Sequence, residues 1–428
     1  MLTRRKFISA VAASSIFAPA LLKAAPNGFT YVGWSQDEAA SKATLGKIFQ
    51  QFQQGDPGAA VNVVGFPYAQ MQQNLFLRLR AHQPVDAAQI ALQWLPQFGA
   101  TGKMVDFNDV YGKAALEKII DPAILRLGQF KGKQMSMPWS AGSIGMVANT
   151  AVLKEAGIPE APVTIDAFIE SLKAVKAKFP EAVPYGMSTK DNASMTADFQ
   201  TWLWTFGGHI FDEQGQVVVN SPAGVRALGF MSDLVKDRLA AKDTDRYDAR
   251  RLFAQNRCAF YQDAPLARGF ARDNSGKGTA FDVNVESIAT PVVKKGDVPR
   301  SFAWGHLLGS FAQDKQSFDV KSAPARFVSY LSMTDEPQLE YFRRIGLFPV
   351  TRSAIAKLSG DPYVANWTRN AKSATRDELA FNPNVADLTV IVGEQVQAAV
   401  LGQKTAAEAL DNMSKRLSAA VAQAGDDA

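Results

Sequence analysis

Aromatic side chains interleaved with hydrogen-bonding ones are the residues of this sequence that could do the most specific chemistry. The chain has seven tryptophans, and most of them fall at or beside the ends of predicted strands. A flat indole ring packs against the C–H face of a polyol, and polar side chains satisfy the hydroxyl groups around it. A hydroxyl buried without a partner costs about 1–3 kcal/mol, so such a site needs both kinds of residue together.

The candidate ligand-binding residues combine five indoles with a phenol, amides and a few charged or hydroxylated side chains. They are Trp34, Gln36, Tyr68, Gln93, Trp94, Trp139, Ser143, Trp204, Asp263, Trp304, His306 and Arg344. Asp263 is a candidate to accept two hydroxyl hydrogens, and Gln262 beside it is a further polar candidate. Arg344 either pairs with an anionic group of the ligand or caps a strand of a hinge.

Nucleophilic, metal-dependent and phosphate-binding chemistry have little support in the sequence. The three histidines, His82, His209 and His306, show no metal-ligand spacing such as H-E-x-x-H, and no loop of the form G-x-x-x-x-G-K-[ST] occurs. The segment A-G-S-I-G around Ser143 lacks the first glycine of a nucleophile elbow. We therefore expect no enzyme activity, no cofactor and no metal. A glycoside hydrolase, which needs two placed carboxylates, stays open as a remote alternative.

The single cysteine and one acidic segment both favour ordinary structural roles. Cys258 cannot form an intramolecular disulfide, and its neighbours C-A-F-Y are typical of a buried strand, so we expect an inert core thiol. The segment D-T-D-R-Y-D at 243–248 lacks the sixth-position glycine of a calcium loop. We interpret this segment as a solvated loop.

Alternating strands and helices in the first part of the chain must position the first indoles. Apolar patterning predicts strands at 29–34 and 61–66 and a third strand ending at Trp94. A capping box beginning at Ser35 predicts the first intervening helix, and 71–79 carries the second. This alternation favours a parallel, doubly wound sheet, in which ligands bind at the carboxyl ends of the strands. The helix beginning at Ser35 would present unpaired backbone amides at the same edge.

The rest of the chain contains further strands and helices and no low-complexity linker. A hairpin is predicted at Gly132, and the small residues from Gly142 to Gly145 allow the backbone to pass between two lobes. The C-terminal segment is Ala-rich with a helical pattern. In the absence of a tether, the lobes are expected to share several chain crossings.

The N-terminus has the features of an export signal. T-R-R-K-F-I, with Arg4 and Arg5, is similar to the twin-arginine motif, although Ser9 replaces its usual lysine. We predict a cleaved signal peptide over 1–24 and a periplasmic mature protein, without a lipid anchor because no cysteine lies near the cleavage region. An ordinary Sec signal is the alternative. Four positively charged residues lie in 1–24, so removal of this segment lowers the formal net charge from +5 to +5 − 4 = +1. A mature protein that is nearly neutral has no obvious basic surface for nucleic acid or an acidic membrane.

Five segments, in order, carry a resemblance to a known family. They are V-G-W-S; Q-W-L-P-Q-F-G-A-T-G-K-M-V-D-F-N-D; K-G-K-Q-M-S-M-P-W-S-A-G-S-I-G-M-V-A-N-T-A-V-L-K-E-A-G-I; F-G-G-H-I-F-D-E-Q-G-Q-V-V-V-N-S-P-A-G-V-R-A-L; and the pair F-A-Q-N-R-C-A-F-Y-Q-D-A-P and G-L-F-P-V-T-R-S-A. Together they extend over nearly the whole mature chain. The sequence thereby resembles the bacterial extracellular solute-binding proteins of the maltose-binding type (family 1), which are substrate-binding components of ABC sugar importers.

The resemblance implies an α/β, two-lobed periplasmic binding protein fold of type II, in which each lobe has a central mainly parallel sheet flanked by helices. By analogy, the lobes are 27–144 with 306–346 and 145–305 with 347–428, joined by a multi-crossing hinge. It also implies a monomer that captures a carbohydrate or sugar-like polyol in an inter-lobe cleft. Inner-membrane ABC permease subunits would receive the ligand.

Two departures from the family pattern leave the ligand class open. The chain has V-A-N at 147–149 where many members have a Tyr-Asn pair, and N-R-C-A-F at 256–260 replaces the expected Gly-Lys-x-Ala-Met. The same fold could bind an anionic sugar, a glycerol phosphodiester, a polyamine or a peptide. An anionic ligand predicts contacts with Arg344, Arg352 or helix N-termini, whereas a polyamine predicts carboxylates around aromatic rings. A purely structural periplasmic module predicts no stabilisation by any ligand.

Overall fold

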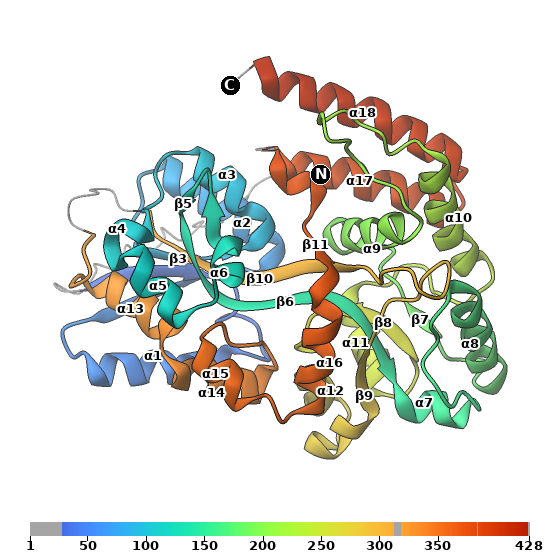
Figure 1. Cartoon of the computed structure of the whole chain (residues 1–428), viewed down its shortest axis with the longest axis horizontal. Helices are drawn as coiled ribbons and strands as arrows, with labels where there is room; N and C mark the ends of the chain where they lie inside the picture. The colour runs from blue at the N-terminus through green and yellow to red at the C-terminus, as the bar shows by residue number, and fades with distance from the viewer. Residues whose placement is uncertain (1–27, 312–317, 383, 427–428) are drawn as a thin grey trace, which may run out of the picture.

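The computed structural model describes residues 28–311, 318–382 and 384–426 of the 428-residue chain. The predicted signal peptide, 1–24, lies outside the described residues. Figure 1 shows two helix-rich halves, and two long strands run across the middle of the molecule from one half to the other.

The first half is built on three parallel strands, as the alternation of strands and helices predicts. β1 (Gly28–Gly33) pairs in parallel with β2 (Ala60–Gly65) and with β3 (Ala87–Ala91). Helices α1 (Lys42–Gly55) and α2 (Tyr68–Arg80) connect these strands, and each buries an apolar stripe against the sheet. Because neighbouring parallel strands point the same way, the carboxyl ends of β1 and β3 lie together at one edge.

The first helix starts later than the capping-box pattern predicts. It begins at Lys42, with Ser41 at the N-cap position, rather than at Ser35. The preceding residues form turns, with backbone bonds from Asp37 N–H to the Trp34 carbonyl at 2.9 Å and from Ser41 N–H to the Glu38 carbonyl at 3.0 Å. The side chain of Gln89 accepts the backbone N–H groups of Trp34 and Ser35 at 3.2 and 3.1 Å. The predicted unpaired amides at Ser35 are therefore wrong: a buried glutamine already takes them.

The third predicted strand ends earlier than expected. β3 stops at Ala91, and Leu92–Trp94 forms a turn of 3-10 helix that leads directly into α3 (Leu95–Ala100). Pro96 lacks a backbone N–H, which suits the first turn of a helix better than the interior of a strand. Trp94 consequently lies just beyond the carboxyl end of β3.

Two long strands connect the halves. β6 (Ser136–Asn149) and β10 (Ser301–Gly309) pair antiparallel with each other, and β10 also pairs antiparallel with β3. The sheet order is β2-β1-β3-β10-β6-β8-β7, so β6 and β10 occupy its centre (Figure 1). β7 and β8 are parallel to each other, while β6 pairs antiparallel with β8 and β9. The further strands are β7 (Tyr185–Gly186), β8 (Phe260–Asp263), β9 (Val285–Ile288) and β11 (Ala374–Thr375).

Helices flank both ends of this sheet. In the first half they are α4 (Phe107–Tyr111), α5 (Lys113–Ile119), α6 (Pro122–Leu125), α13 (Ala323–Met333), α14 (Asp335–Ile345) and α15 (Arg352–Lys357). In the second half they are α7 (Thr150–Glu155), α8 (Ile165–Lys178), α9 (Asn192–Thr205), α10 (Pro222–Lys236), α11 (Arg246–Ala254), α12 (Ala267–Asn274), α16 (Pro362–Asn370), α17 (Val385–Val400) and α18 (Ala406–Asp426). A hairpin of β4 (Gln129–Phe130) and β5 (Lys133–Gln134) confirms the turn predicted at Gly132.

Separate hydrophobic cores lie on either side of the crossing strands. The cores of the first half draw on 29–141 and 304–350, and those of the second half draw on 146–288 and 348–421. A small cluster lies between them, made of Ile144, Ala197, Trp204, Ala264 and Phe302. The division into a first lobe, 27–144 with 306–346, and a second lobe, 145–305 with 347–428, stays a proposal, because Leu347 and Val350 pack in a core of the first half.

The arrangement is the two-lobed α/β fold that the sequence predicts. The Ala-rich C-terminal segment forms α18, which packs along α17 at the upper right of Figure 1. Within the described ranges, no helix is both long and apolar enough to cross a membrane.

Candidate functional site

Three aromatic rings meet at the carboxyl ends of β1 and β3. Trp34 follows β1, Trp94 follows β3, and Tyr68 is the first residue of α2. The rings of Tyr68 and Trp94 are stacked with centroids 5.4 Å apart, and Trp34 meets each of them edge to face at 5.4 Å. Gln93 donates from Nε2 to the Tyr68 hydroxyl at 2.9 Å, which fixes the phenol. The parallel strands thus bring these four predicted site residues together.

Two side chains of the crossing strand β10 extend this cluster. The His306 ring lies 4.9 Å from that of Trp34 and 4.5 Å from that of Trp304. We call Trp34, Tyr68, Trp94, Trp304 and His306 the aromatic wall. Trp34, Trp94 and His306 are more than nine-tenths buried, whereas Tyr68 and Trp304 are partly exposed. The ring surfaces open to a ligand therefore belong mainly to Tyr68 and Trp304.

A buried amide beneath the aromatic wall joins its parts. Gln89, on β3, bonds to the backbone amides of Trp34 and Ser35, and its Nε2 lies 2.7 Å from the Ser35 hydroxyl and 3.1 Å from Nδ1 of His306. It was not among the predicted site residues. The signal that could have found it is a lone polar side chain in the buried strand A-A-Q-I-A, because a buried amide needs hydrogen-bond partners.

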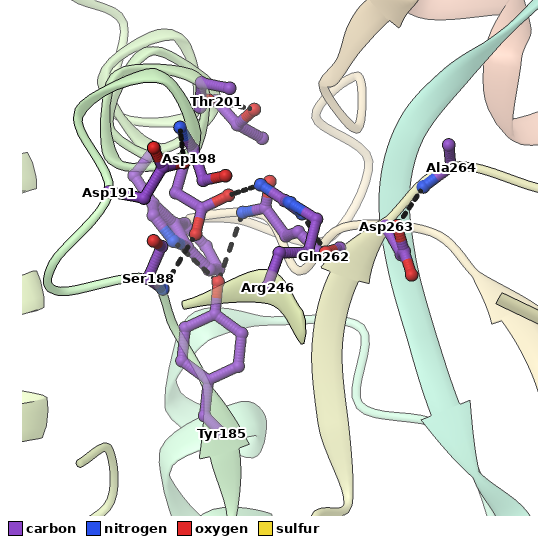
Figure 2. Close-up of polar contacts among 12 residues, drawn as sticks. Tyr185, Ser188, Asp191, Asp198, Thr201, Arg246, Gln262, Asp263 and Ala264 are labelled. Atoms are coloured by element: carbon purple, nitrogen blue, oxygen red, sulfur yellow. Dashed lines mark hydrogen bonds and ion pairs between the residues drawn. The ribbon is translucent and has the colours of Figure 1, made fainter. Parts of the chain in front are cut away.

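A network of polar side chains lies at the carboxyl ends of β7 and β8 in the second lobe (Figure 2). Arg246, the first residue of α11, donates to Oδ1 of Asp198 at 2.7 Å and to the backbone carbonyl of Gln262. Oδ2 of Asp198 accepts the backbone N–H of Ser188 at 3.2 Å, and Gln262 donates from Nε2 to the Tyr185 hydroxyl at 3.2 Å. We call Tyr185, Ser188, Asp198, Arg246 and Gln262 the polar network.

The two charged side chains of the polar network, Asp198 and Arg246, form an ion pair. Two other polar atoms of the network have no hydrogen-bond partner among the described residues. Burial raises the pKa of Asp198, and Arg246 partly offsets this effect. Burial alone would lower the pKa of Arg246, and the charges of Asp198 and Asp263 raise it instead. In the described part of the chain, Oγ of Ser188 and Oε1 of Gln262 are buried without a hydrogen-bond partner. Such atoms are rare in native proteins and indicate a place for a water molecule or a ligand hydroxyl.

The two lobes also touch through a carboxylate and a phenol. The hydroxyl of Tyr247, on α11, donates to Oε1 of Glu38 at 3.2 Å, in the turn after β1. Burial raises the pKa of Glu38, while Arg250 and the Tyr247 hydrogen bond oppose the change. Burial also raises the pKa of Tyr68, and the charge of Asp191, at the start of α9, raises it further. The beginnings of α9 and α11 therefore lie next to the aromatic wall.

Trp139, a predicted site residue, belongs to the core of the first lobe. Its ring is stacked on that of Tyr341 with centroids 5.1 Å apart, and only 2% of the residue is exposed. The pairing of β6 with β10 shifts between His306 and Leu307, which disturbs the alternation of side chains at this point. Trp139 lies beside the aromatic wall at His306, with 6.1 Å between the two ring centroids.

Ser143 lies on the wrong face of the crossing strands to join the aromatic wall. Trp304 is paired with Gly142, and Ser143 is paired with Ala303. Because successive residues of a strand point to opposite faces, Ser143 and Trp304 are on different sides of the sheet. The predicted ligand contact of Ser143 is therefore dropped from the site.

Trp204 packs beside the crossing strands and is held by a carboxylate that the sequence did not indicate. Its ring is stacked on Phe302 at 5.9 Å, and its Nε1 donates to Oε1 of Glu378 at 2.5 Å. Glu378 also accepts the backbone N–H groups of Ile210 and Phe211. These bonds fix the C-terminal end of α9 rather than leave Trp204 free for a ligand.

Three predicted polar residues are committed to other partners. Both carboxylate oxygens of Asp263 accept from Arg250, at 2.7 and 2.8 Å. Gln36 donates from Nε2 to backbone carbonyls at the ends of β1 and β2, at 2.7 and 3.1 Å. Arg344 lies in the last turn of α14, not on a hinge strand, and forms an ion pair with Asp273 at 2.7 Å. These side chains hold elements in place, and we no longer propose them as ligand contacts.

The acidic segment at 243–248 is not a solvated loop. Asp245 and Asp248 form the capping box of α11, and Thr244 before them is buried. This segment therefore starts the helix that carries Arg246 and Arg250, and the interpretation from sequence was wrong because their carboxylate partners lie on other elements.

The single cysteine is a buried thiol, as predicted. Burial raises the pKa of Cys258 to about 12, so the reactive thiolate is scarce near neutral pH. Across the described residues, no group of three or more His, Cys, Asp and Glu side chains is arranged to hold a metal ion.

A buried carboxyl near Trp204 gives the protein a testable pH dependence. Burial raises the pKa of Asp377 to about 6, although a hydrogen bond from Gln200 at 2.8 Å opposes the change. The folded protein holds this proton more tightly than the unfolded chain, so the contribution to stability is present below about pH 4 and is lost as the pH rises through 6.

Asp377→Asn is therefore expected to raise the free energy of unfolding by about 1–3 kcal/mol at pH 7.5 and to change it little at pH 4. Urea unfolding of both proteins at the two pH values measures the difference. Asp233→Asn, at an exposed position on α10, is the control and should show no such gap. An Asp377→Asn protein with the same pH profile as the wild type contradicts this assignment.

A two-lobed protein with an aromatic wall on one lobe and a polar network on the other has the architecture of a solute-binding protein. A family model described as bacterial extracellular solute-binding protein matches residues 47–375. The chain belongs to this family.

The known relatives are distant in sequence. A probable ABC transporter-binding protein of Deinococcus radiodurans is 29% identical over 41% of this chain, and the match spans 43% of that protein's length. The sn-glycerol-3-phosphate-binding periplasmic protein UgpB of Brucella abortus is 26% identical over 68% of this chain and 69% of its own. A maltotriose-binding protein of Pyrococcus abyssi is 22% identical over 69% of this chain and 60% of its own.

Solved structures share the fold over nearly the whole chain. Maltose-bound MalE3 of T. maritima has a TM-score of 0.79 at 21% identity, covering 91% of this chain and 98% of its own. A solute-binding protein of Agrobacterium radiobacter K84 in complex with ribitol has a TM-score of 0.77 at 19% identity, covering 92% of this chain and 98% of its own. At these identities the likeness establishes the architecture.

Proposed function

We propose that this protein captures a neutral carbohydrate or sugar-like polyol between its lobes and delivers it to an ABC-type importer, without catalysing a reaction. The observation that carries the proposal is the aromatic wall, whose partly exposed Tyr68 and Trp304 rings lie beside the hydrogen-bonding side chains of Gln93 and His306. Flat rings suit the C–H faces of a sugar, and the two unpartnered atoms of the polar network suit its hydroxyls. The relative named for maltotriose supports the same ligand class.

An anionic ligand is the second candidate, because the Brucella relative is named for sn-glycerol-3-phosphate. Arg126 and Arg376 converge across the lobes: Arg376 donates to the Arg126 carbonyl at 2.8 Å, and its pKa is lowered by burial and by the charge of Arg126. In contrast, Arg246 and Arg250 on α11 are each paired with a buried carboxylate. The charges of these two arginines are thus already neutralised, which favours a neutral ligand.

The export route and partners complete the proposal. Arg4 and Arg5 support a twin-arginine signal peptide over 1–24 that is cleaved in the periplasm without lipid anchoring. The mature protein would act as a monomer and dock on inner-membrane permease subunits. The family of extracellular solute-binding proteins is consistent with such an exported partner of a transporter.

A thermal-shift screen tests the ligand class. Maltose, maltotriose, N,N′-diacetylchitobiose and ribitol form the neutral arm, sn-glycerol-3-phosphate the anionic arm and spermidine the cationic arm. A bound ligand at a hundredfold excess over Kd stabilises the fold by about 2.7 kcal/mol, so a clear rise of Tm is expected in the neutral arm. A rise only with sn-glycerol-3-phosphate, abolished by Arg376→Gln, would replace the proposal with the second candidate. An unchanged Tm with every compound in the three arms would favour a structural role.

A further inference from the structure

The amide of Gln89 has only one orientation that suits all its partners. Its Oε1 lies 3.2 and 3.1 Å from the backbone nitrogens of Trp34 and Ser35, which can only donate. The other end of the amide, Nε2, must therefore be the donor, and it lies 2.7 Å from the Ser35 hydroxyl and 3.1 Å from Nδ1 of His306. Two backbone N–H groups thus fix the side-chain orientation without reference to the histidine.

This orientation determines which nitrogen of His306 carries a proton. Nδ1 accepts from Gln89, so a neutral ring must carry its proton on Nε2. Burial lowers the pKa of His306 to about 3, and the rings around it, Trp34, Trp139 and Trp304, carry no charge. The imidazole is therefore neutral between pH 5 and 8. Within the described residues no hydrogen bond reaches Nε2.

We propose that His306 donates from Nε2–H to an oxygen atom of the bound ligand, and that Gln89 is the positioning residue that fixes this tautomer. The inference rests on the proposed function and narrows its ligand class. Next to the Trp304 ring, the ligand must present an atom that accepts, such as a hydroxyl, ring or glycosidic oxygen. An ammonium group only donates, so the same position discriminates against amines.

The tautomer is measured directly by nitrogen-15 NMR of the histidine rings in the unliganded protein. The chain has three histidines, and His306→Gln assigns the His306 signals by removing one set. We expect shifts typical of the Nε2–H tautomer that stay constant from pH 5 to pH 8. An Nδ1–H tautomer, or titration of His306 within that range, overturns the proposal.

Gln89→Leu tests the positioning role. Without the amide donor, Nδ1 of His306 is free to carry the proton, so the two tautomers should become mixed and the His306 nitrogen shifts should move. Gln395→Leu removes another buried glutamine, on α17, and should leave those shifts unchanged. Circular dichroism confirms that each variant is folded. Unchanged His306 shifts in folded Gln89→Leu overturn the role of Gln89. Should that variant not fold, the pH-independent tautomer of the wild type decides the assignment.

Calorimetry with the sugar that stabilises the wild type most in the neutral arm tests the donor. His306→Leu is expected to weaken binding about 10–100-fold, because a buried ligand oxygen loses its partner. His306→Gln can place an amide N–H near the former Nε2 and should stay within about fivefold of the wild type. Equal affinity for all three proteins overturns the donor role. If no sugar binds the wild type, the proposed function and the donor role both fail, while the tautomer measurement still reports on Gln89.

Discussion

Replacing Arg250 with methionine is expected to lower the free energy of unfolding by about 3–5 kcal/mol, because it strands a buried carboxylate. Asp263 is completely buried, and both its oxygens accept from Arg250. The Asp263 charge raises the pKa of the guanidinium against the effect of burial. Arg250 also lies over the Phe270 ring at 4.4 Å, so its charge is matched by a carboxylate and by an aromatic face. Urea unfolding of the unliganded protein measures the loss.

A matched arginine on the surface supplies the control. Arg344 makes an ion pair with Asp273 at 2.7 Å, but its side chain is 54% exposed, so Arg344→Met should cost less than about 1 kcal/mol. The double variant Arg250→Met, Asp263→Leu removes both buried charges and should recover much of the loss. Equal costs for Arg250→Met and Arg344→Met would show that the buried pair is not the source of the stability.

Arg250 also illustrates what the sequence could not reveal. In D-T-D-R-Y-D-A-R-R, charged residues dominate, and such composition is typical of a solvated surface. The carboxylates that pair with Arg246 and Arg250 come from α9 and β8, 48 and 13 residues away along the chain. Periodicity describes one element at a time, so it cannot show that a charged face will be buried against a carboxylate from another element.

The aromatic wall, in contrast, was largely accessible to sequence reasoning. Parallel β1 and β3 must end at the same edge, so Trp34 and Trp94 had to lie close together once the strands were recognised. Ser143 and Trp139 lie outside the aromatic wall for a local reason. The direction of a side chain on β6 depends on its register with β10, and that register shifts beside His306. A one-residue change of register exchanges the two faces of a strand.

The buried side chain of Gln89 links the turn after β1 to the crossing strand β10. The same side chain accepts the backbone N–H of Ser35 at one end and donates to Nδ1 of His306 at the other, so it holds the turn after β1 and gives His306 a defined proton. The turn after β1 and the crossing strand β10 are thereby linked through β3. The edge of the first lobe that faces the ligand is consequently positioned by a buried hydrogen-bonded group rather than by helix capping.

Two tryptophans that both contact His306 should respond differently to the same substitution. The Trp304 ring lies 4.5 Å from His306 and is partly exposed, whereas the Trp139 ring lies 6.1 Å away and is 2% exposed. Trp304→Leu is expected to weaken binding of the preferred sugar about 30-fold or more, as tryptophans at binding hot spots contribute about 2 kcal/mol or more. Calorimetry at a temperature where both proteins are folded measures the affinity.

Trp139→Leu is expected to act on stability instead. Its ring is stacked on Tyr341 in the core of the first lobe, so the smaller side chain leaves a cavity and should lower the free energy of unfolding by about 2–4 kcal/mol. Its affinity for the sugar should stay within about threefold of the wild type. The opposite pattern, with Trp139→Leu losing affinity and Trp304→Leu binding normally, would contradict the assignment of the ligand to the exposed indole, Trp304. The expected pattern has a simple reason: Trp304 is partly exposed and can offer a ring face to the ligand, whereas Trp139 is buried.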